Sequence, residues 1–373
     1  MSTLKVNNIQ NASGTDAISI GSDGSLSYPN IGRRNLIING AMQVAQRGTS
    51  STGVTSVGFY TADRFKLGIS NLGTWTVDQS ADAPSGFSNS LKVTATTADA
   101  SPAAGDVFYY YYNIESQDLQ HLAYGTSSAK PMTLSFWVKS NVTGTATVSM
   151  LQTDNANKVI SPTYTINSAD TWEYKTVSIP ADVAGNIDND VNTGFAIYWF
   201  INSGTDYSSG TNQTSWSTYS ATHRNASNLG VGGSTSDYFA ITGVQLEVGS
   251  VATPFEARSY GEELALCQRY YTKFKTGELY AHFAEGHSIS TTQSRTTHHL
   301  PVEMRSNPTV TYAELYLYNY AASFQVTSNS GRWGGPLALS LQWNHSTMSQ
   351  HPVGVSVGPY NTYTAYVAFD AEL

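Results

Sequence analysis

Charged side chains are scarce in this sequence. Only 12% of the 373 residues are Asp, Glu, Lys or Arg, whereas an ordinary soluble domain has roughly 25%. The 27 acidic and 19 basic side chains give a formal net charge of −8, and the basic residues form no block. The chain therefore lacks the concentrated positive charge with which proteins bind phosphate backbones. We expect no nucleic-acid partner.

Cysteine and long apolar runs are also missing. Cys267 is the single cysteine, which excludes a disulfide framework and a zinc site built on paired cysteines. No run of about 18 apolar residues is present, and the segment from Met1 to Asn8 lacks the apolar core of a signal peptide. We expect synthesis in a cytoplasm and no membrane insertion.

Glycine and tyrosine, in contrast, are abundant, with 31 and 24 residues. From about residue 34 to 257, short runs alternate apolar and polar residues, as in Leu134–Lys139, and turn residues separate the runs. Phe195–Ile201 is apolar on both faces and predicts a central strand covered on both sides. The pattern predicts an all-β fold with a jelly-roll β-sandwich over residues 34–257.

The segments on either side of this sandwich differ from it and from each other. Residues 1–33 hold two short apolar stretches that cannot bury a core alone, which predicts a segment for attachment or oligomerisation. Residues 276–373 resume the alternating pattern and predict a smaller C-terminal β-domain at the tip of the molecule.

Residues 258–275 predict a connecting helix. Ser259 and Glu262 have the spacing of a capping box before an apolar run. Apolar and aromatic residues then follow at intervals of 4, 3, 4 and 3, the spacing of a coiled-coil seam: Tyr260, Leu264, Cys267, Tyr271 and Phe274. Two heptads leave two interpretations open, a helix packed on its own domain and a three-chain junction.

Several segments resemble a known family. They are Arg34–Gly48, Tyr60–Phe65, Ile241–Gly249, Ala252–Arg258 and Glu263–Tyr271. The first two resemble the opening, and the last three the end, of a carbohydrate-binding-module-like sandwich found in phage tail fibres. The N-terminal Met-Ser-Thr-Leu-Lys-Val-Asn-Asn-Ile is similar to the virion-proximal start of such fibres.

This resemblance implies a structural, non-enzymatic protein of a bacteriophage virion. It would be a tail fibre or similar appendage, an elongated homotrimer joined to other virion tail proteins through its N-terminal segment, with attachment to a host surface glycan or receptor. Such a protein would be made in the host cytoplasm and located in the virion. Two alternatives remain open: a head-attached or adaptor-like structural protein without receptor binding, and a glycan-degrading tailspike.

Sugar recognition needs flat aromatic faces beside short polar side chains. A Ser-, Thr- and Asn-rich loop from Tyr207 to Asn228, a run of four tyrosines from Tyr109 to Tyr112, and the C-terminal domain offer this combination. Alternation along a strand sends the four tyrosines to opposite faces in pairs, and we take the second and fourth as the exposed pair. The candidate glycan contacts are Trp216, Tyr219, Tyr110, Tyr112, Trp333, Trp343 and Tyr360. The competing interpretation is that these aromatics fill a core or a subunit interface.

Metal and cofactor sites are not predicted. The turns Asn186–Asn192 and Asp154–Asn157 hold oxygen ligands of the kind calcium prefers, but no spaced ligand motif, so a structural calcium is only an option. Adjacent His298 and His299 would point to opposite faces of a strand. Only a ring of three copies on a trimer axis would bring them to one metal.

Enzyme motifs are missing as well. Glycan cleavage needs two carboxylates about 5–10 Å apart, and the acidic residues here are scattered. The sequence has no nucleophile elbow, no phosphate-cradling Gly-Lys-Ser/Thr loop and no parallel β-helix repeat. We therefore predict a binding protein that is not an enzyme.

Overall fold

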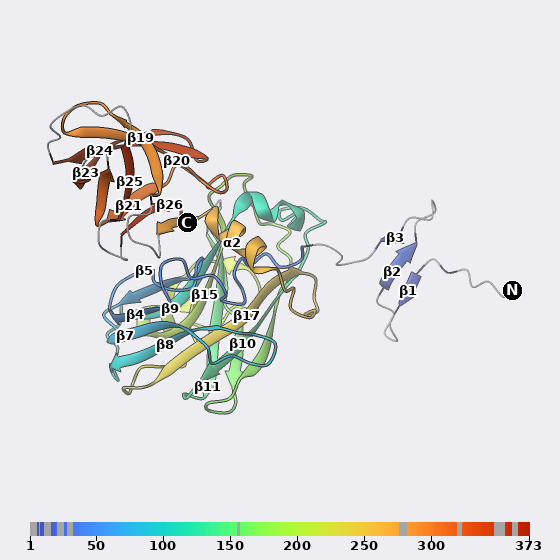
Figure 1. The fold of residues 1–373 in the computed structure, drawn as a ribbon. Helices are drawn as coiled ribbons and strands as arrows, with labels where there is room; N and C mark the ends of the chain where they lie inside the picture. The colour runs from blue at the N-terminus through green and yellow to red at the C-terminus, as the bar shows by residue number, and fades with distance from the viewer. Residues whose placement is uncertain are drawn as a thin grey trace.

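The computed structural model describes residues 6, 8–10, 16–20, 26–27, 33–154, 157–275, 282–318, 323–346, 355–359 and 365–373. Strands dominate these residues, and the helices are short (Figure 1). In this part of the chain no helix has the length and apolar character needed to cross a bilayer. The predicted all-β sandwich is confirmed.

Three short strands occupy the N-terminal segment: β1 (Asn8–Gln10), β2 (Asp16–Ile20) and β3 (Leu26–Ser27). They pair antiparallel with one another in the order β1-β2-β3.

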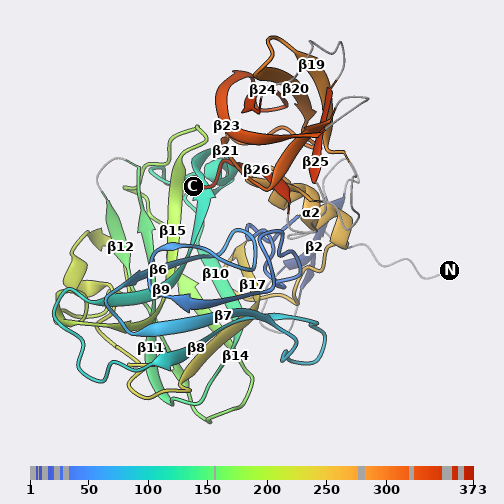
Figure 2. The ribbon, with the colours of Figure 1, turned by 60° about the vertical axis from the view of Figure 1, so that its left-hand side comes forward.

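Two antiparallel sheets form the sandwich (Figures 1 and 2). The six-stranded sheet has the order β14 (Glu173–Ile179), β10 (Met132–Ser140), β17 (Tyr238–Val248), β8 (Ser90–Thr97), β7 (Thr74–Ser80) and β4 (Ser50–Val54). The eight-stranded sheet has the order β16 (Ser217–Thr218), β12 (Lys158–Ile160), β11 (Gly144–Gln152), β15 (Thr193–Ser203), β9 (Val107–Glu115), β6 (Lys66–Ser70) and β5 (Gly58–Phe59), with β13 (Thr163–Ile166) also paired to β11.

The core lies between these sheets, where the inward residues of each strand meet. Trp199 from β15 and Phe136 from β10 are fully buried, with ring centroids 6.1 Å apart. On the outer side of β15, Phe200 is also fully buried, and Ala196 packs with Leu151 in a small second cluster. The predicted central strand, covered on both sides, is therefore confirmed.

Four short helices connect the strands. They are the 3-10 helices η1 (Ser116–Leu122) and η2 (Ala221–His223) and the α-helices α1 (Thr205–Ser208) and α2 (Tyr260–Gln268). The predicted cap of α2 is confirmed, because the Ser259 side chain accepts a hydrogen bond from the Glu262 backbone N–H at 3.3 Å.

The predicted extent of this helix was wrong. The helix ends at Gln268, and Tyr271–Lys275 forms strand β18, so a heptad seam through Tyr271 and Phe274 does not exist. The reason is long-range pairing: β18 pairs with β26 (Tyr366–Asp370), and Phe274 packs its ring edge-on against Phe369, with centroids 5.8 Å apart. Local periodicity contains no information about this distant strand.

The C-terminal part is a closed barrel beside a three-stranded sheet. Around the barrel the order is β19 (Ala284–Ser288), β20 (Gln293–His299), β24 (Ala338–His345), β23 (Ser323–Gly334), β22 (Leu315–Tyr318) and β25 (Val355–Pro359). Strand β26 is the centre of the small sheet, between β18 and β21 (Thr309–Ala313). Figure 2 shows the barrel beyond α2, at one end of the sandwich.

Buried ion pairs join the C-terminus to the sandwich. Arg64 is 2% exposed, has a positive φ of 74°, and donates to the Glu372 carboxylate and to the Asn113 carbonyl oxygen. Arg47 stacks on the Tyr271 ring at 3.6 Å and donates to Asp370 at 3.0 Å. These contacts hold the last strand against the first loops of the sandwich.

Candidate functional site

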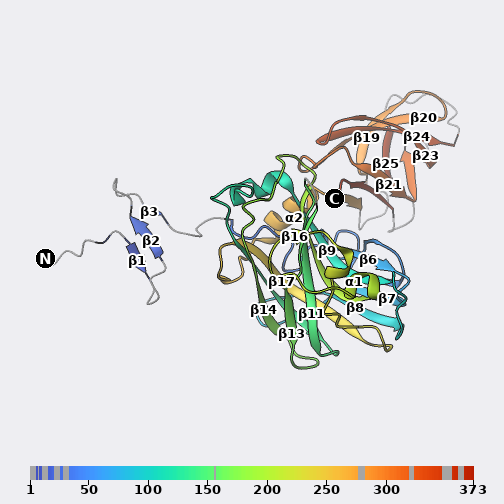
Figure 3. The same ribbon diagram turned by 180° about the vertical axis from the view of Figure 1, so that it is seen from behind.

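A group of tyrosines covers the outer side of the eight-stranded sheet. Strands β9 and β15 are antiparallel neighbours, with Tyr111 opposite Tyr198 and Tyr109 opposite Phe200. Because side chains alternate along a strand, these residues all point away from the core. Figure 3 shows this sheet from behind, with α1 beside it. We call Tyr109, Tyr111, Tyr198, Tyr207 and Tyr219 the tyrosine face.

The ring packing on this face is specific. The rings of Tyr111 and Tyr198 stack with centroids 5.5 Å apart and an interplanar angle of 18°. Tyr109 meets Tyr198 edge-on at 5.0 Å. Gly68 lies opposite Tyr109 on β6, and a Cβ at Gly68 would lie 2.1 Å from a carbon of the Tyr109 ring. The absence of a side chain at Gly68 thus lets this ring lie over the neighbouring strand.

A loop from β15 to β17 completes the face. Tyr207 in α1 packs on Phe200, with ring centroids 6.3 Å apart, and Tyr219 follows β16 with 38% of its surface exposed. The Tyr198 pKa rises to about 12, first through burial; Arg224 opposes the rise, and the hydroxyls of Tyr109, Tyr111 and Tyr219 add to it. Tyr219 therefore lies within electrostatic range of the Tyr198 hydroxyl.

The five hydroxyl groups are available for a ligand. None of them hydrogen-bonds to another residue in the described part of the chain. None is among the described polar atoms that are both buried and without a hydrogen-bond partner. The pKa values of Tyr109, Tyr111 and Tyr198 are raised, mainly by burial, so their hydroxyls stay neutral and both donate and accept hydrogen bonds. Aromatic faces with free hydroxyls offer a sugar both kinds of contact that it needs.

Arg224 lies among these rings. Its guanidinium carbon is 4.2 Å from the centroid of Tyr198, 5.2 Å from that of Phe200 and 5.6 Å from that of Tyr109. The residue is 6% exposed, and its Nε and Nη2 atoms are buried without a hydrogen-bond partner. No local pattern marks this arginine, because its partners come from strands about 25 and 115 residues earlier in the chain.

The prediction for Tyr110 and Tyr112 was wrong. These residues are 0% and 1% exposed and point into the core, where the Tyr110 hydroxyl donates to the Phe239 carbonyl oxygen at 3.2 Å. The Tyr112 hydroxyl accepts from the Ile38 backbone N–H at 2.8 Å. The alternation was correct, but the exposed pair is Tyr109 and Tyr111, since the phase of the strand is set by its partners in the sheet.

The side chains of Trp216 and Trp343 pack and form hydrogen bonds within the protein. Trp216 is half-buried, stacks on Phe195 at 5.8 Å and donates its indole N–H to the Pro180 carbonyl oxygen at 2.9 Å. Trp343 is 0% exposed in the barrel core, and its indole N–H donates to the Thr296 hydroxyl at 2.7 Å. Trp343 therefore cannot contact a glycan, because closure of the barrel turns its strand face inward.

Trp333 is exposed on the barrel, with 46% of its surface accessible, and the Arg295 guanidinium lies 4.2 Å from its ring centroid. This single ring offers a smaller surface than the five-residue tyrosine face. Tyr360 lies outside the described residues.

A second aromatic surface, not predicted from the sequence, lies on the outer side of the six-stranded sheet. Trp137 and Tyr174 are opposite each other on β10 and β14, with ring centroids 5.4 Å apart. With Phe87 and Phe255, whose rings meet edge-on at 5.0 Å, they line a groove of about 580 Å³. We call this the Trp137 groove. Trp137 and Tyr174 lie in segments whose alternation predicts strands, but nothing in the sequence pattern indicates the contribution of Phe87.

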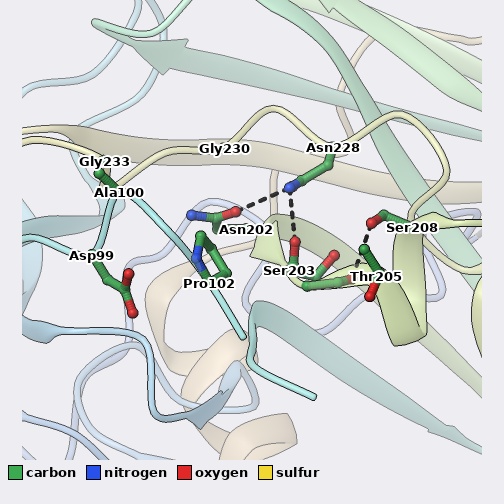
Figure 4. Close-up of a pocket in the computed structure, with 11 residues that line it drawn as sticks. Asp99, Ala100, Pro102, Asn202, Ser203, Thr205, Ser208, Asn228, Gly230 and Gly233 are labelled. Carbon is green, nitrogen blue, oxygen red and sulfur yellow. Dashed lines mark hydrogen bonds between the residues drawn. The ribbon is translucent and has the colours of Figure 1, made fainter. Parts of the chain in front are cut away.

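A polar pocket of about 290 Å³ lies at the end of β15, next to α1 (Figure 4). Its amides bind one another: Asn228 Nδ2 donates to Asn202 Oδ1 at 3.0 Å and to the Ser203 carbonyl oxygen at 2.9 Å. No aromatic ring lines it. This pocket lacks a surface on which a sugar ring could stack, and its hydrogen bonds fix the loop that carries Tyr207.

The acidic turns and histidines are explained by local contacts. Asp154 Oδ2 accepts from the Ser116 hydroxyl at 2.8 Å and from the Asp188 N–H at 3.0 Å. His298 is buried, which lowers its pKa to about 4, while His299 is exposed on the opposite side of β20. Within the described ranges no group of three or more His, Cys, Asp or Glu side chains is placed to hold a metal ion.

Comparisons with known proteins give partial structural likenesses. No family model matches the chain, and no curated protein matches it in sequence. Among solved structures, a putative sugar-binding protein from Bacteroides thetaiotaomicron is 12% identical with a TM-score of 0.33, covering 58% of this chain and 100% of its own. A family 11 carbohydrate-binding module of a Clostridium thermocellum cellulase is 11% identical with a TM-score of 0.25, covering 54% of this chain and 92% of its own.

The enzymatically active domain of bacteriophage CBA120 tailspike protein 4 is also similar, at 14% identity and a TM-score of 0.31. The match covers 58% of this chain but spans only 21% of the tailspike chain. At these identities and scores, no ligand or residue role transfers from any of the three proteins.

Proposed function

We propose that this protein binds a surface glycan through the tyrosine face. The observation that carries the proposal is the set of tyrosine hydroxyls without a described partner, held beside stacked rings on the outer side of β9 and β15. Sugars present apolar C–H faces that pack on aromatic rings, together with hydroxyls that need donors and acceptors. The tyrosine face supplies both, and the Trp137 groove supplies mainly apolar contacts.

A glycan array probed with the purified full chain tests this proposal. We expect binding of one glycan class, and loss of that binding in the variant Tyr109→Ala/Tyr198→Ala. A chain that binds no glycan, or whose binding survives this double substitution, would contradict the proposal. The variant Trp137→Ala/Tyr174→Ala is the matched control, since it removes two aromatic rings from the other outer face.

We further propose that the protein acts as a non-enzymatic appendage of a bacteriophage virion, attached through its N-terminal segment and assembled as a homotrimer. The support is the resemblance of the segments around Arg34–Gly48 and Ile241–Gly249 to phage tail-fibre modules. A trimer would multiply weak single-site binding on a repetitive surface, because linked sites raise the effective concentration.

Light scattering and cell binding test this second proposal together. A trimeric mass, with binding to host cells that blocks infection, would support an attachment protein. A trimer that ignores host cells would favour the adaptor-like structural protein. Release of sugar fragments from a bound polysaccharide would instead favour the glycan-degrading tailspike.

A further inference from the structure

Two arginines are buried in the described part of the chain, and their surroundings differ. Arg64 pairs with Glu372 and donates to a carbonyl oxygen. Burial lowers the Arg64 pKa, but the charge and hydrogen bond of Glu372, together with Tyr112 and Tyr270, raise it above its usual value. The Arg224 side chain has no salt bridge and donates no hydrogen bond to a described residue, and its Nε and Nη2 atoms are buried without a partner. Four aromatic rings surround it instead: Tyr109, Tyr198, Phe200 and Tyr207.

An unpaired buried cation is costly, because burial removes the water that stabilises its charge. Ring faces offset part of this cost through cation–π attraction, but they do not satisfy N–H donors. A bound anion would supply the missing charge, and it can accept from Nη1, the guanidinium nitrogen that is not among the buried unpartnered atoms. The free protein therefore holds a positive charge ready for an anionic ligand at the tyrosine face.

The other cation on this face is placed differently. The Lys66 ammonium lies 5.2 Å from the Tyr111 ring centroid, on the side where Asp370 and Glu372 approach. Burial lowers the Lys66 pKa, and these two carboxylates oppose that effect. Lys66 thus already has acidic neighbours, whereas no described carboxylate forms a salt bridge with Arg224. The charge asymmetry favours an anion at the Arg224 side.

We infer that the ligand of the tyrosine face is an acidic glycan, whose sugar rings pack on Tyr198 and Tyr109 while a sugar carboxylate pairs with Arg224. A carboxylate suits this site because a charge-assisted hydrogen bond from a guanidinium to a carboxylate is roughly twice as strong as a bond between neutral groups. This inference rests on the proposed glycan binding and adds the chemical class of the sugar.

Matched pairs of glycans provide the test. Each carboxylate-bearing oligosaccharide on an array is paired with its carboxyl-reduced counterpart, which carries a neutral hydroxymethyl group in place of the carboxylate, and the full chain is the probe. We expect at least one acidic member to bind about 10-fold or more tightly than its reduced partner, as the loss of a charge-assisted contact predicts. That preference should fall steeply as the salt concentration rises.

Substitutions at Arg224 connect the preference to this residue. Arg224→Gln should abolish the preference for the acidic member, and Arg224→Lys, which keeps the charge, should retain most of it. The thermal midpoint of Arg224→Gln should stay near that of the wild type because no native ion pair is lost, whereas Arg64→Gln should lower it. Unchanged preference in a folded Arg224→Gln protein would overturn the inference.

The two proposals fail in different ways. Equal binding of acidic and reduced partners, or binding of neutral glycans alone, would overturn the acidic-glycan inference and leave glycan binding at the tyrosine face intact. Binding of no glycan at all, or binding that ignores Tyr109→Ala/Tyr198→Ala, would overturn both.

Discussion

The two sides of strand β9 use the same residue type for opposite purposes. On the inner side, Tyr110 and Tyr112 are fully buried and their hydroxyls bond to the backbone of other segments. On the outer side, Tyr109 and Tyr111 are half-buried, stack with β15 and keep their hydroxyls free of described partners. On the same strand, the inward tyrosines bond to other segments of the fold, and the outward tyrosines keep hydroxyls that a ligand could use.

The largest effect should come from the outer side. Tyr109→Ala/Tyr198→Ala removes two stacking surfaces, each worth about 1–1.5 kcal/mol beyond its buried area, so glycan affinity should fall roughly 50-fold. Isothermal titration with the array-selected glycan measures this loss. The control Trp137→Ala/Tyr174→Ala should change affinity less than about 2-fold. A larger loss in the control would move the site to the Trp137 groove.

The second effect is a pH dependence of stability that arises from a buried carboxyl group and not from the tyrosine face. Burial raises the Asp63 pKa from 3.8 to about 6, against the opposing effects of Arg47 and Gln46. Because the folded protein holds this proton more tightly than the unfolded chain, the contribution of Asp63 to stability increases as pH falls from 6 toward 4. Relative to Asp63→Asn, the wild type should gain about 2 kcal/mol of unfolding free energy between pH 7 and pH 4.5.

Denaturant titrations of both proteins at several pH values measure this gain. A stability difference that stays constant from pH 7 to pH 4.5 would show that Asp63 does not titrate there. Glycan affinity should change little over the same range, because the tyrosines of the face have raised pKa values and stay neutral.

Single hydroxyl deletions compare the two sides of β9 directly. Tyr112→Phe removes the acceptor of the Ile38 N–H and should cost about 1 kcal/mol of unfolding free energy without changing glycan affinity. Tyr111→Phe removes a hydroxyl without a described partner and should leave stability unchanged while weakening binding. Chemical denaturation measures the unfolding free energy of each variant, and titration measures its glycan affinity. The reverse pattern would contradict the assignment of the two sides.

The smallest effect should come from Gly68→Ala. The added methyl group would lie 2.1 Å from the Tyr109 ring, so the ring must move, and glycan affinity should fall about 3-fold. Gly261→Ala is the control, since a Cβ there meets no atom within 4 Å. Titration measures both variants, and equal affinities would show that the position of the Tyr109 ring does not matter for binding.

Much of the sandwich could be predicted from the sequence because its strands follow local rules. Alternation gave strands such as Leu134–Lys139 and the central strand Phe195–Ile201, and the Ser259 cap marked the start of α2. These features depend on residues close together in sequence.

The remaining features depend on contacts between distant residues. Four identical tyrosines carry no signal for which pair faces the core, so Tyr110 and Tyr112 were chosen in error. Arg64 and Glu372 are 308 residues apart in sequence, and only the folded chain brings them together. Arg224 was missed because an unpaired buried cation is recognisable only when its surroundings are known.

Hydroxyl-radical footprinting of the full chain, with and without its bound glycan, tests the central claim most directly. We expect protection of Tyr109, Tyr111, Tyr198 and Tyr219, with Trp137, Tyr174 and Trp333 unchanged. Protection of Trp137 and Tyr174, or of Trp333, with the tyrosine face still reactive, would contradict it.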